Sequence, residues 1–125
     1  MIDFSNATFS KLNMVSNDSF ASQVESILID GESILSSYKG IRDGVVFTNK
    51  RIIAINIQGI TGKKKDFTSM PYSKVQVYSV ETSGVFDLDS ELDLWFSGIG
   101  KVRFEFTSKS NVAEICRSIS NFILK

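Results

Sequence analysis

The spacing of apolar residues changes along this chain, from the alternation typical of strands to the spacing of one helical face. From residue 33 onward, apolar residues alternate with polar ones or form short runs between turn residues, which is typical of β-strands. The pattern predicts seven strands, at residues 33–38, 44–48, 51–57, 66–70, 75–82, 88–96 and 101–107. The period then lengthens, and the spacing of one helical face predicts a closing helix over 111–125, with its apolar stripe at Val112, Ile115, Cys116, Ile119, Phe122 and Ile123.

Two pairs of strands are joined by short turns. Only Asn49 and Lys50 separate strands 44–48 and 51–57, and Asn tolerates the left-handed conformation of a type I′ hairpin. A loop centred on Ile99 joins the last two strands, and the expected partners are Phe96 with Val102, Leu94 with Phe104 and Leu92 with Phe106. This register sends Trp95 and Arg103 to the opposite, outward face, directly across from each other.

The first thirty residues carry helical signals. Phe4, Phe9, Leu12 and Val15 suit one or two helical turns, with an extended arm as the alternative. Asn17 precedes a second apolar stripe that starts at Phe20 and predicts a helix ending near residues 30–31. We therefore expect one domain, with a helical extension at 1–30, a seven-stranded barrel at 31–108 and a capping helix at 111–125.

This order of elements restricts the fold class. An antiparallel sheet that buries one face needs a cover, so strands followed by one helix predict a mainly β, curled antiparallel barrel that the helix closes. Strand 51–57 has apolar residues on both of its faces, so its outer face also needs a cover. Either an N-terminal helix or another subunit provides it.

Composition excludes several functions. Fourteen basic and fourteen acidic residues cancel, so the totals give no reason to expect nucleic acid as a partner. Histidine is absent, which removes the commonest general base and metal ligand, and no nucleophile, cofactor loop or catalytic pair is legible. The single cysteine and the lack of an apolar run of membrane length favour a cytoplasmic protein. We expect no enzyme activity, no cofactor and no metal.

Three segments carry a family resemblance. Residues 40–54 (GIRDGVVFTNKRIIA), 60–67 (ITGKKKDF) and 86–92 (FDLDSEL) resemble, in this order, the bacterial pleckstrin-homology-like family. The resemblance implies a pleckstrin-homology fold and self-association, since members are thought to form homo-oligomers. The chain departs from phosphoinositide binders, because its first hairpin turn offers only Lys39 and Arg42, beside Asp43. Phosphoinositide or membrane contact is therefore not the expected function.

Two candidate surfaces follow. The first is an oligomer interface, possibly within a ring, on strand edges and the outer sheet face, formed by Ile53, Ile55, Tyr78, Asp87, Asp89, Glu91, Trp95 and Arg103. Its acidic strand is expected to meet a neighbour's Lys63, Lys64 and Lys65 rather than calcium, because alternate carboxylates on a strand spread along a line. The alternative is a membrane or anion contact formed by Lys39, Arg42, Lys63, Lys64 and Lys65.

Overall fold

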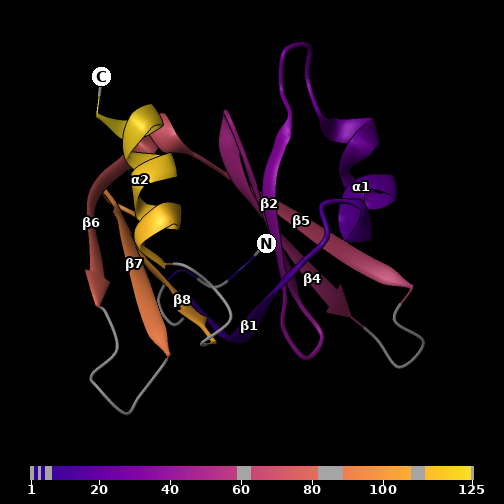
Figure 1. The fold of residues 1–125 in the computed structure, drawn as a ribbon, viewed down its shortest axis with the longest axis horizontal. Helices are drawn as coiled ribbons and strands as arrows, with labels where there is room; N and C mark the ends of the chain where they lie inside the picture. The colour runs from indigo at the N-terminus through magenta and orange to yellow at the C-terminus, as the bar shows by residue number, and fades with distance from the viewer. Residues whose placement is uncertain are drawn as a thin grey trace.

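The architecture is one curled sheet of eight strands with a helix on each side (Figure 1). The computed structural model describes residues 2, 4, 7–58, 63–81, 89–107 and 112–124. The strands are β1 (Ala7–Val15), β2 (Ile34–Lys39), β3 (Gly44–Thr48), β4 (Arg51–Gln58), β5 (Lys64–Pro71), β6 (Val75–Glu81), β7 (Ser90–Phe96) and β8 (Gly100–Phe106). The helices are α1 (Asp18–Val24) and α2 (Val112–Ile123), with 3₁₀ turns η1 (Glu25–Ile27) and η2 (Tyr72–Lys74).

Strand β1 joins the two halves of the sheet. In the order β5-β4-β3-β2-β1-β8-β7-β6, its first half pairs in parallel with β8 and its last three residues pair antiparallel with β2. The change of partner occurs at a bulge between Phe9 and Leu12, where Lys11 has a φ of 53°. Just beyond the bulge, Thr107 donates its backbone N–H to the carbonyl of Leu12, which continues the contact with β8.

Of the two alternatives for residues 1–17, the extended one is correct for the segment that β1 occupies, and the helical one is wrong there. Phe9 and Leu12 are both buried although they lie three residues apart, because the bulge shifts the strand's alternation by one position. A spacing of three is also that of a helical turn, so local periodicity does not separate the two structures. The barrel has one strand more than the seven predicted.

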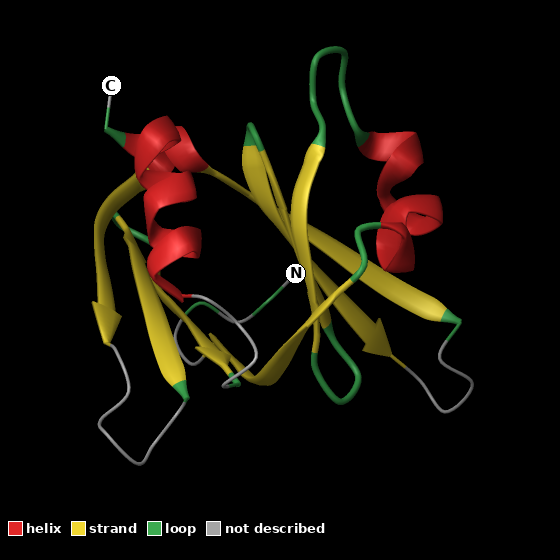
Figure 2. Cartoon of the chain, in the orientation of Figure 1, coloured by secondary structure: helices red, strands yellow, loops and turns green. Residues whose placement is uncertain are grey.

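The inner core lies between the concave face of the sheet and α2 (Figure 2). Tyr38, Phe47, Phe104 and Phe106 contact one another there, with ring centroids 5.0 to 6.5 Å apart. Helix α2 contributes buried Ile115 and Ile119, as the apolar stripe predicted. Its contacts with η2, β6 and β7 place it against that half of the concave face.

A second, smaller core lies on the outer face of β3 and β4, where α1 covers it. Phe20 and Val24 pack against Val46, Ile53 and Ile55, and these three side chains are fully buried. This resolves the alternatives for the apolar strand: a helix of the same chain covers it. The helix is shorter than predicted, since α1 ends at Val24 and Leu28 is already extended.

A buried ion pair ties the segment after α1 to the β3–β4 turn. Arg51 donates from Nε and Nη2 to the carboxylate of Glu32, both at 3.0 Å, and that side chain has no exposed surface. Thr48 donates its hydroxyl to the same carboxylate at 2.6 Å. Burial alone raises the pKa of Glu32, but the hydrogen bonds from Arg51 and Thr48 outweigh it and hold this pKa below its usual value.

Both predicted hairpins form, but each differs in one detail. The two-residue turn between β3 and β4 is confirmed, but Asn49 does not have a positive φ. Its side chain accepts a hydrogen bond from Ser33 N–H and donates one to Gly31 O. In the last hairpin Phe96 pairs with Gly100, so the register is shifted by two residues from the predicted one. The predicted faces hold, because a shift of two preserves the alternation.

Among the described residues, no helix combines the length and the apolar composition needed to cross a bilayer.

We expect Gly44→Ala to displace α1. A Cβ at this position would lie 2.5 Å from Cζ of Phe20, whose ring is buried, so the ring and the helix that carries it must shift. The expected cost is about 1 to 3 kcal/mol of unfolding free energy, measured by urea denaturation. In a Phe20→Leu background the same change should cost less, and equal costs in both backgrounds would contradict this packing.

Stability should fall in acid through Glu32. Because its folded pKa is lowered, its contribution is complete above the unfolded value near 4.5 and is lost as pH falls through the folded pKa. Glu32→Gln should cost about 1 to 3 kcal/mol at pH 7, since Arg51 loses a charged acceptor. Urea titrations at pH 7 and pH 3 should show a smaller acid loss for the variant, and an unchanged loss would contradict this role.

Candidate interaction surface

The outer face of β6, β7 and β8 carries three rows of side chains across the strands. Strand pairing places Val77 beside Trp95 and Trp95 beside Lys101 in the first row. The second row is Ser79, Asp93 and Arg103, and the third is Glu81, Glu91 and Glu105. The alternate residues of β7 and β8 point into the core, so strand parity alone sends these side chains outward.

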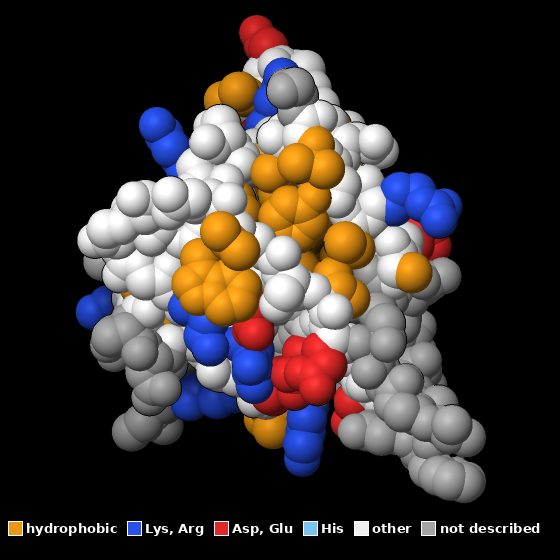
Figure 3. Space-filling view, turned by 90° about the vertical axis from the view of Figure 1, so that its left-hand side faces the viewer, with side chains coloured by type: hydrophobic (Ala, Val, Ile, Leu, Met, Phe, Trp, Pro, Cys, Tyr) orange, Lys and Arg blue, Asp and Glu red, His pale blue; other side chains and the backbone are white. Residues whose placement is uncertain are grey.

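Trp95 forms an apolar centre on this face. Its indole is partly exposed, its neighbour Val77 is 56% exposed, and Lys101 Nζ lies 5.8 Å from the ring centroid. Figure 3 shows hydrophobic side chains gathered on the side of the molecule that carries β6, with basic and acidic side chains close together below them. An apolar centre with a charged border is the arrangement of a protein interface.

Arg103 organises the charges of the second and third rows. Its guanidinium donates to both carboxylate oxygens of Asp93, at 2.9 and 3.1 Å, and lies 3.3 Å from Glu91. The hydrogen bonds to Asp93 raise the pKa of Arg103 above its usual value. The Arg103 guanidinium thus contacts two carboxylates, and its contact with Asp93 is the closer one.

The third row retains excess negative charge. Desolvation raises the pKa of Glu91, and the neighbouring carboxylates of Glu81 and Glu105 raise it further, against the opposing effect of Arg103. Three glutamates side by side therefore repel one another on adjacent strands. A cation supplied from outside this row would relieve the repulsion.

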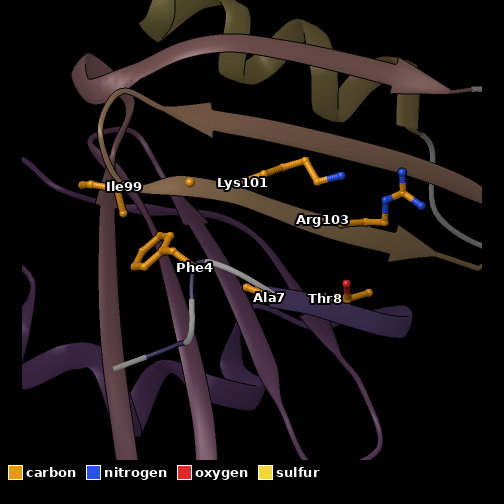
Figure 4. Close-up of a pocket in the computed structure, with 7 residues that line it drawn as sticks. Phe4, Ala7, Thr8, Ile99, Lys101 and Arg103 are labelled. Atoms are coloured by element: carbon orange, nitrogen blue, oxygen red, sulfur yellow. The ribbon is translucent and has the colours of Figure 1, made fainter.

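Beside these rows lies a depression of about 550 Å³, lined by Phe4, Ala7, Thr8, Ile99, Gly100, Lys101 and Arg103 (Figure 4). Lys101 and Arg103 lie along the same strand at its border. Both cations at this border have partners on the outer face, since Asp93 holds the Arg103 guanidinium and Lys101 Nζ lies over the Trp95 ring.

Three predicted interface positions are wrong in their placement. Ile53 and Ile55 lie under α1 and have no exposed surface, because the same chain supplies their cover. Tyr78 pairs with Leu94 and so faces inward, where its hydroxyl lies 2.8 Å from Ser120 Oγ of α2. Arg103 faces outward as predicted, but it lies across from Asp93, and Trp95 lies across from Lys101.

The other predicted positions divide into three groups. Asp89 is exposed beside the start of β7, Glu91 lies within the outer face, and Asp87 lies outside the described residues. Lys64 and Lys65 are exposed at the start of β5, and Lys63 is exposed just before it. Strand pairing brings this segment and the β2–β3 turn, with Lys39 and Arg42, to the same end of the sheet.

Three outward residues were missed by the sequence reasoning: Val77 and Lys101 as neighbours of Trp95, and Glu81 as a neighbour of Glu91. Their parity was available from the sequence, since each alternates with a core residue. Which of them meet across strands depends on the register, and the two-residue shift changed every outward pair between β7 and β8.

Comparison with known proteins identifies the family. The family model described as the bacterial PH domain matches residues 3–123, nearly the whole chain. The chain belongs to the bacterial PH domain family. Two proteins of Bacillus subtilis (strain 168), both described as uncharacterized, are similar: YjqA is 54% identical over 72 residues, and YozO is 33% identical over 101 residues. The matches cover 58% of this chain and 58% of YjqA, and 81% of this chain and 87% of YozO.

Solved structures share the PH-like fold. A pleckstrin-homology-domain protein from Shewanella loihica PV-4 superposes with a TM-score of 0.80 at 40% identity, covering 91% of this chain and 98% of that one. A pleckstrin homology domain from Shewanella amazonensis SB2B gives a TM-score of 0.67 at 39% identity, covering 89% of this chain and 90% of that one. The expected family and fold class are confirmed, and this family is generally non-catalytic.

Proposed function

We propose that this PH-like domain is a non-catalytic, cytoplasmic scaffold module that binds other copies of itself. The observation that supports this most is the partly exposed Trp95 beside the exposed Val77, at the centre of an otherwise charged sheet face. A large aromatic on a solvent-facing strand is costly to leave uncovered and is the residue type that most often anchors an interface.

The adjoining sheet edge supports the same function. Strand β6 pairs only with β7, so one side of its backbone has no strand partner within the described sheet. Unpaired strand edges attract other strands unless they are blocked by proline, bulges or a cover, and the bulge of β6 between Val75 and Val77 leaves the rest of the strand regularly paired. The open edge and the apolar centre are contiguous through Val77, so one neighbouring subunit can cover both.

The test is the mass of the protein in solution. Native chain, Trp95→Ala and Ile41→Ala should be compared by light scattering on a sizing column over a range of concentrations. Ile41 is 82% exposed in the β2–β3 turn and serves as the control for removal of an exposed apolar side chain. We expect a discrete native multimer that the control retains and Trp95→Ala weakens by about 2 kcal/mol, roughly 30-fold.

Two results would overturn this function. A native chain that stays monomeric at every concentration would remove self-association altogether. A multimer that Trp95→Ala leaves unchanged would place the interface elsewhere on the molecule. Circular dichroism and urea denaturation of Trp95→Ala should separate loss of the interface from loss of the fold.

The second candidate is binding to an anionic membrane surface. The observation that favours it is the placement of Lys39 and Arg42 at the same end of the sheet as Lys64 and Lys65. If this function is correct, the protein should sediment with vesicles containing anionic lipid at low salt and be released at high salt. Changing Lys63, Lys64 and Lys65 together to Glu should abolish that sedimentation. Native protein that stays in the supernatant at low salt would exclude this function.

A further inference from the structure

The last pairing of the edge strand β6 places two carboxylates together. Glu81, the final residue of β6, pairs with Glu91 of β7, and Glu91 pairs in turn with Glu105 of β8. We call these three residues the glutamate row. Residues paired across neighbouring strands have their Cβ atoms about 4.5 to 5.5 Å apart, and like charges in such positions weaken the pairing. When ionised, the row therefore acts against the pairing that holds the end of β6 in the sheet.

The cations near the glutamate row do not balance its charge. Arg103 Nη1 lies 3.3 Å from Glu91 Oε2, but the same guanidinium donates two hydrogen bonds to Asp93. Lys101 lies over the Trp95 ring, two rows away. Beside the row is a cleft of about 290 Å³ whose charged lining residues are Lys11, Asp89, Glu91 and Glu105. Among the described residues, carboxylates thus outnumber cations around Glu91.

A proton can lie directly between two members of the row. The carboxyl groups of Glu81 and Glu91 are in hydrogen-bond contact. Ionised carboxylates only accept hydrogen bonds, so this contact requires that one of the two groups carries a proton. Desolvation of Glu91 and the carboxylates of Glu81 and Glu105 favour its protonated form and raise the pKa of Glu91, against the effect of Arg103.

We propose that Glu81 and Glu91 form a pH-dependent contact that controls how firmly the end of β6 is held to β7. With a proton bound, the two carboxyl groups share a hydrogen bond across the strands. With the proton released to solvent, the two carboxylates repel each other, and Glu91 keeps only its ion pair with Arg103. The end of β6 then separates from β7 more easily.

The pH dependence of this contact is opposite in sign to that of Glu32. Because the folded pKa of Glu91 is raised, the folded chain binds more protons here than the unfolded chain at pH values just above 4.5. The stability of the native chain should therefore increase as pH falls from 7 toward 4.5. The loss of stability through Glu32 takes place below that value, because the folded pKa of Glu32 is lowered.

The contact also links pH to the proposed function. Strand β6 carries the open edge and Val77, which the proposed neighbouring subunit covers. A firmly paired β6 presents this surface in one conformation, so self-association should strengthen as pH falls from 7.5 to 5. This link rests on the proposed self-association, whereas the contact itself lies within a single chain.

Nuclear magnetic resonance of the glutamate carboxyl groups tests the contact directly. We expect the Glu91 carboxyl to titrate at a higher pH than that of Glu25, an exposed glutamate in η1. Glu81→Gln should lower the midpoint of Glu91, because the amide carries no charge. Glu25→Gln is the matched control and should leave that midpoint unchanged.

Hydrogen exchange of the backbone amides at the end of β6 tests the consequence. After correction for the intrinsic effect of pH on exchange, their protection should be about 3-fold or more greater at pH 5 than at pH 7.5. Glu91→Gln, which is uncharged at both pH values, should remove this difference. Titration and exchange are measured in the native chain and in Trp95→Ala, where the proposed assembly is weakened. Light scattering gives the mass at both pH values.

The outcomes separate this inference from the function linked to it. A Glu91 midpoint no higher than that of Glu25 would overturn the contact, and so would an unchanged pH effect on β6 exchange in Glu91→Gln. A chain that is monomeric at both pH values, with titration and exchange as expected, would overturn self-association and leave the contact standing. A multimer that is equally stable at both pH values would overturn the link between the two.

Discussion

The fold depends on one strand that has two partners. Strand β1 pairs in parallel with β8 and then antiparallel with β2, and without it the sheet would be two separate sheets with two further open edges. The bulge near Lys11 permits this, because it bends the strand and changes which residues face the core. The aromatic cluster of Tyr38, Phe47, Phe104 and Phe106 can then form from residues of both halves.

With β1 joining the two halves of the sheet, the remaining surfaces differ in whether a helix covers them. Helix α2 packs against η2, β6 and β7, and α1 covers the outer face of β3 and β4. The outer face of β6, β7 and β8 has no helix over it within the described chain, and Trp95 lies there. The position of the candidate interaction surface therefore follows from where the chain's two helices pack.

The predicted strands agree closely with the observed ones because each alternates over a buried face and ends at a turn residue. Strand β3 has the predicted limits, β4 and β6 differ by one residue at one end, and β2 and β8 differ by one residue at both ends. The failures lie where the alternation is interrupted or where pairing is not local. Because of the bulge, the apolar residues of β1 have the spacing of a helical turn. The turn at Gly98, whose φ is 74°, gives the last hairpin a register that differs by two residues from the predicted one. The sequence correctly predicted that Trp95 and Arg103 face outward, but it did not predict their cross-strand neighbours.

The sequence by itself determined the strands from residue 34 onward, the closing helix and the inward or outward direction of most side chains, because these depend on the spacing of apolar residues over short distances. Only the tertiary structure decided that α1 covers Ile53 and Ile55, that Tyr78 faces α2, and that three glutamates form one row. These facts depend on pairing between segments far apart in the chain. Local hydrophobic pattern carries no information about which distant strand or helix supplies the other side of a contact.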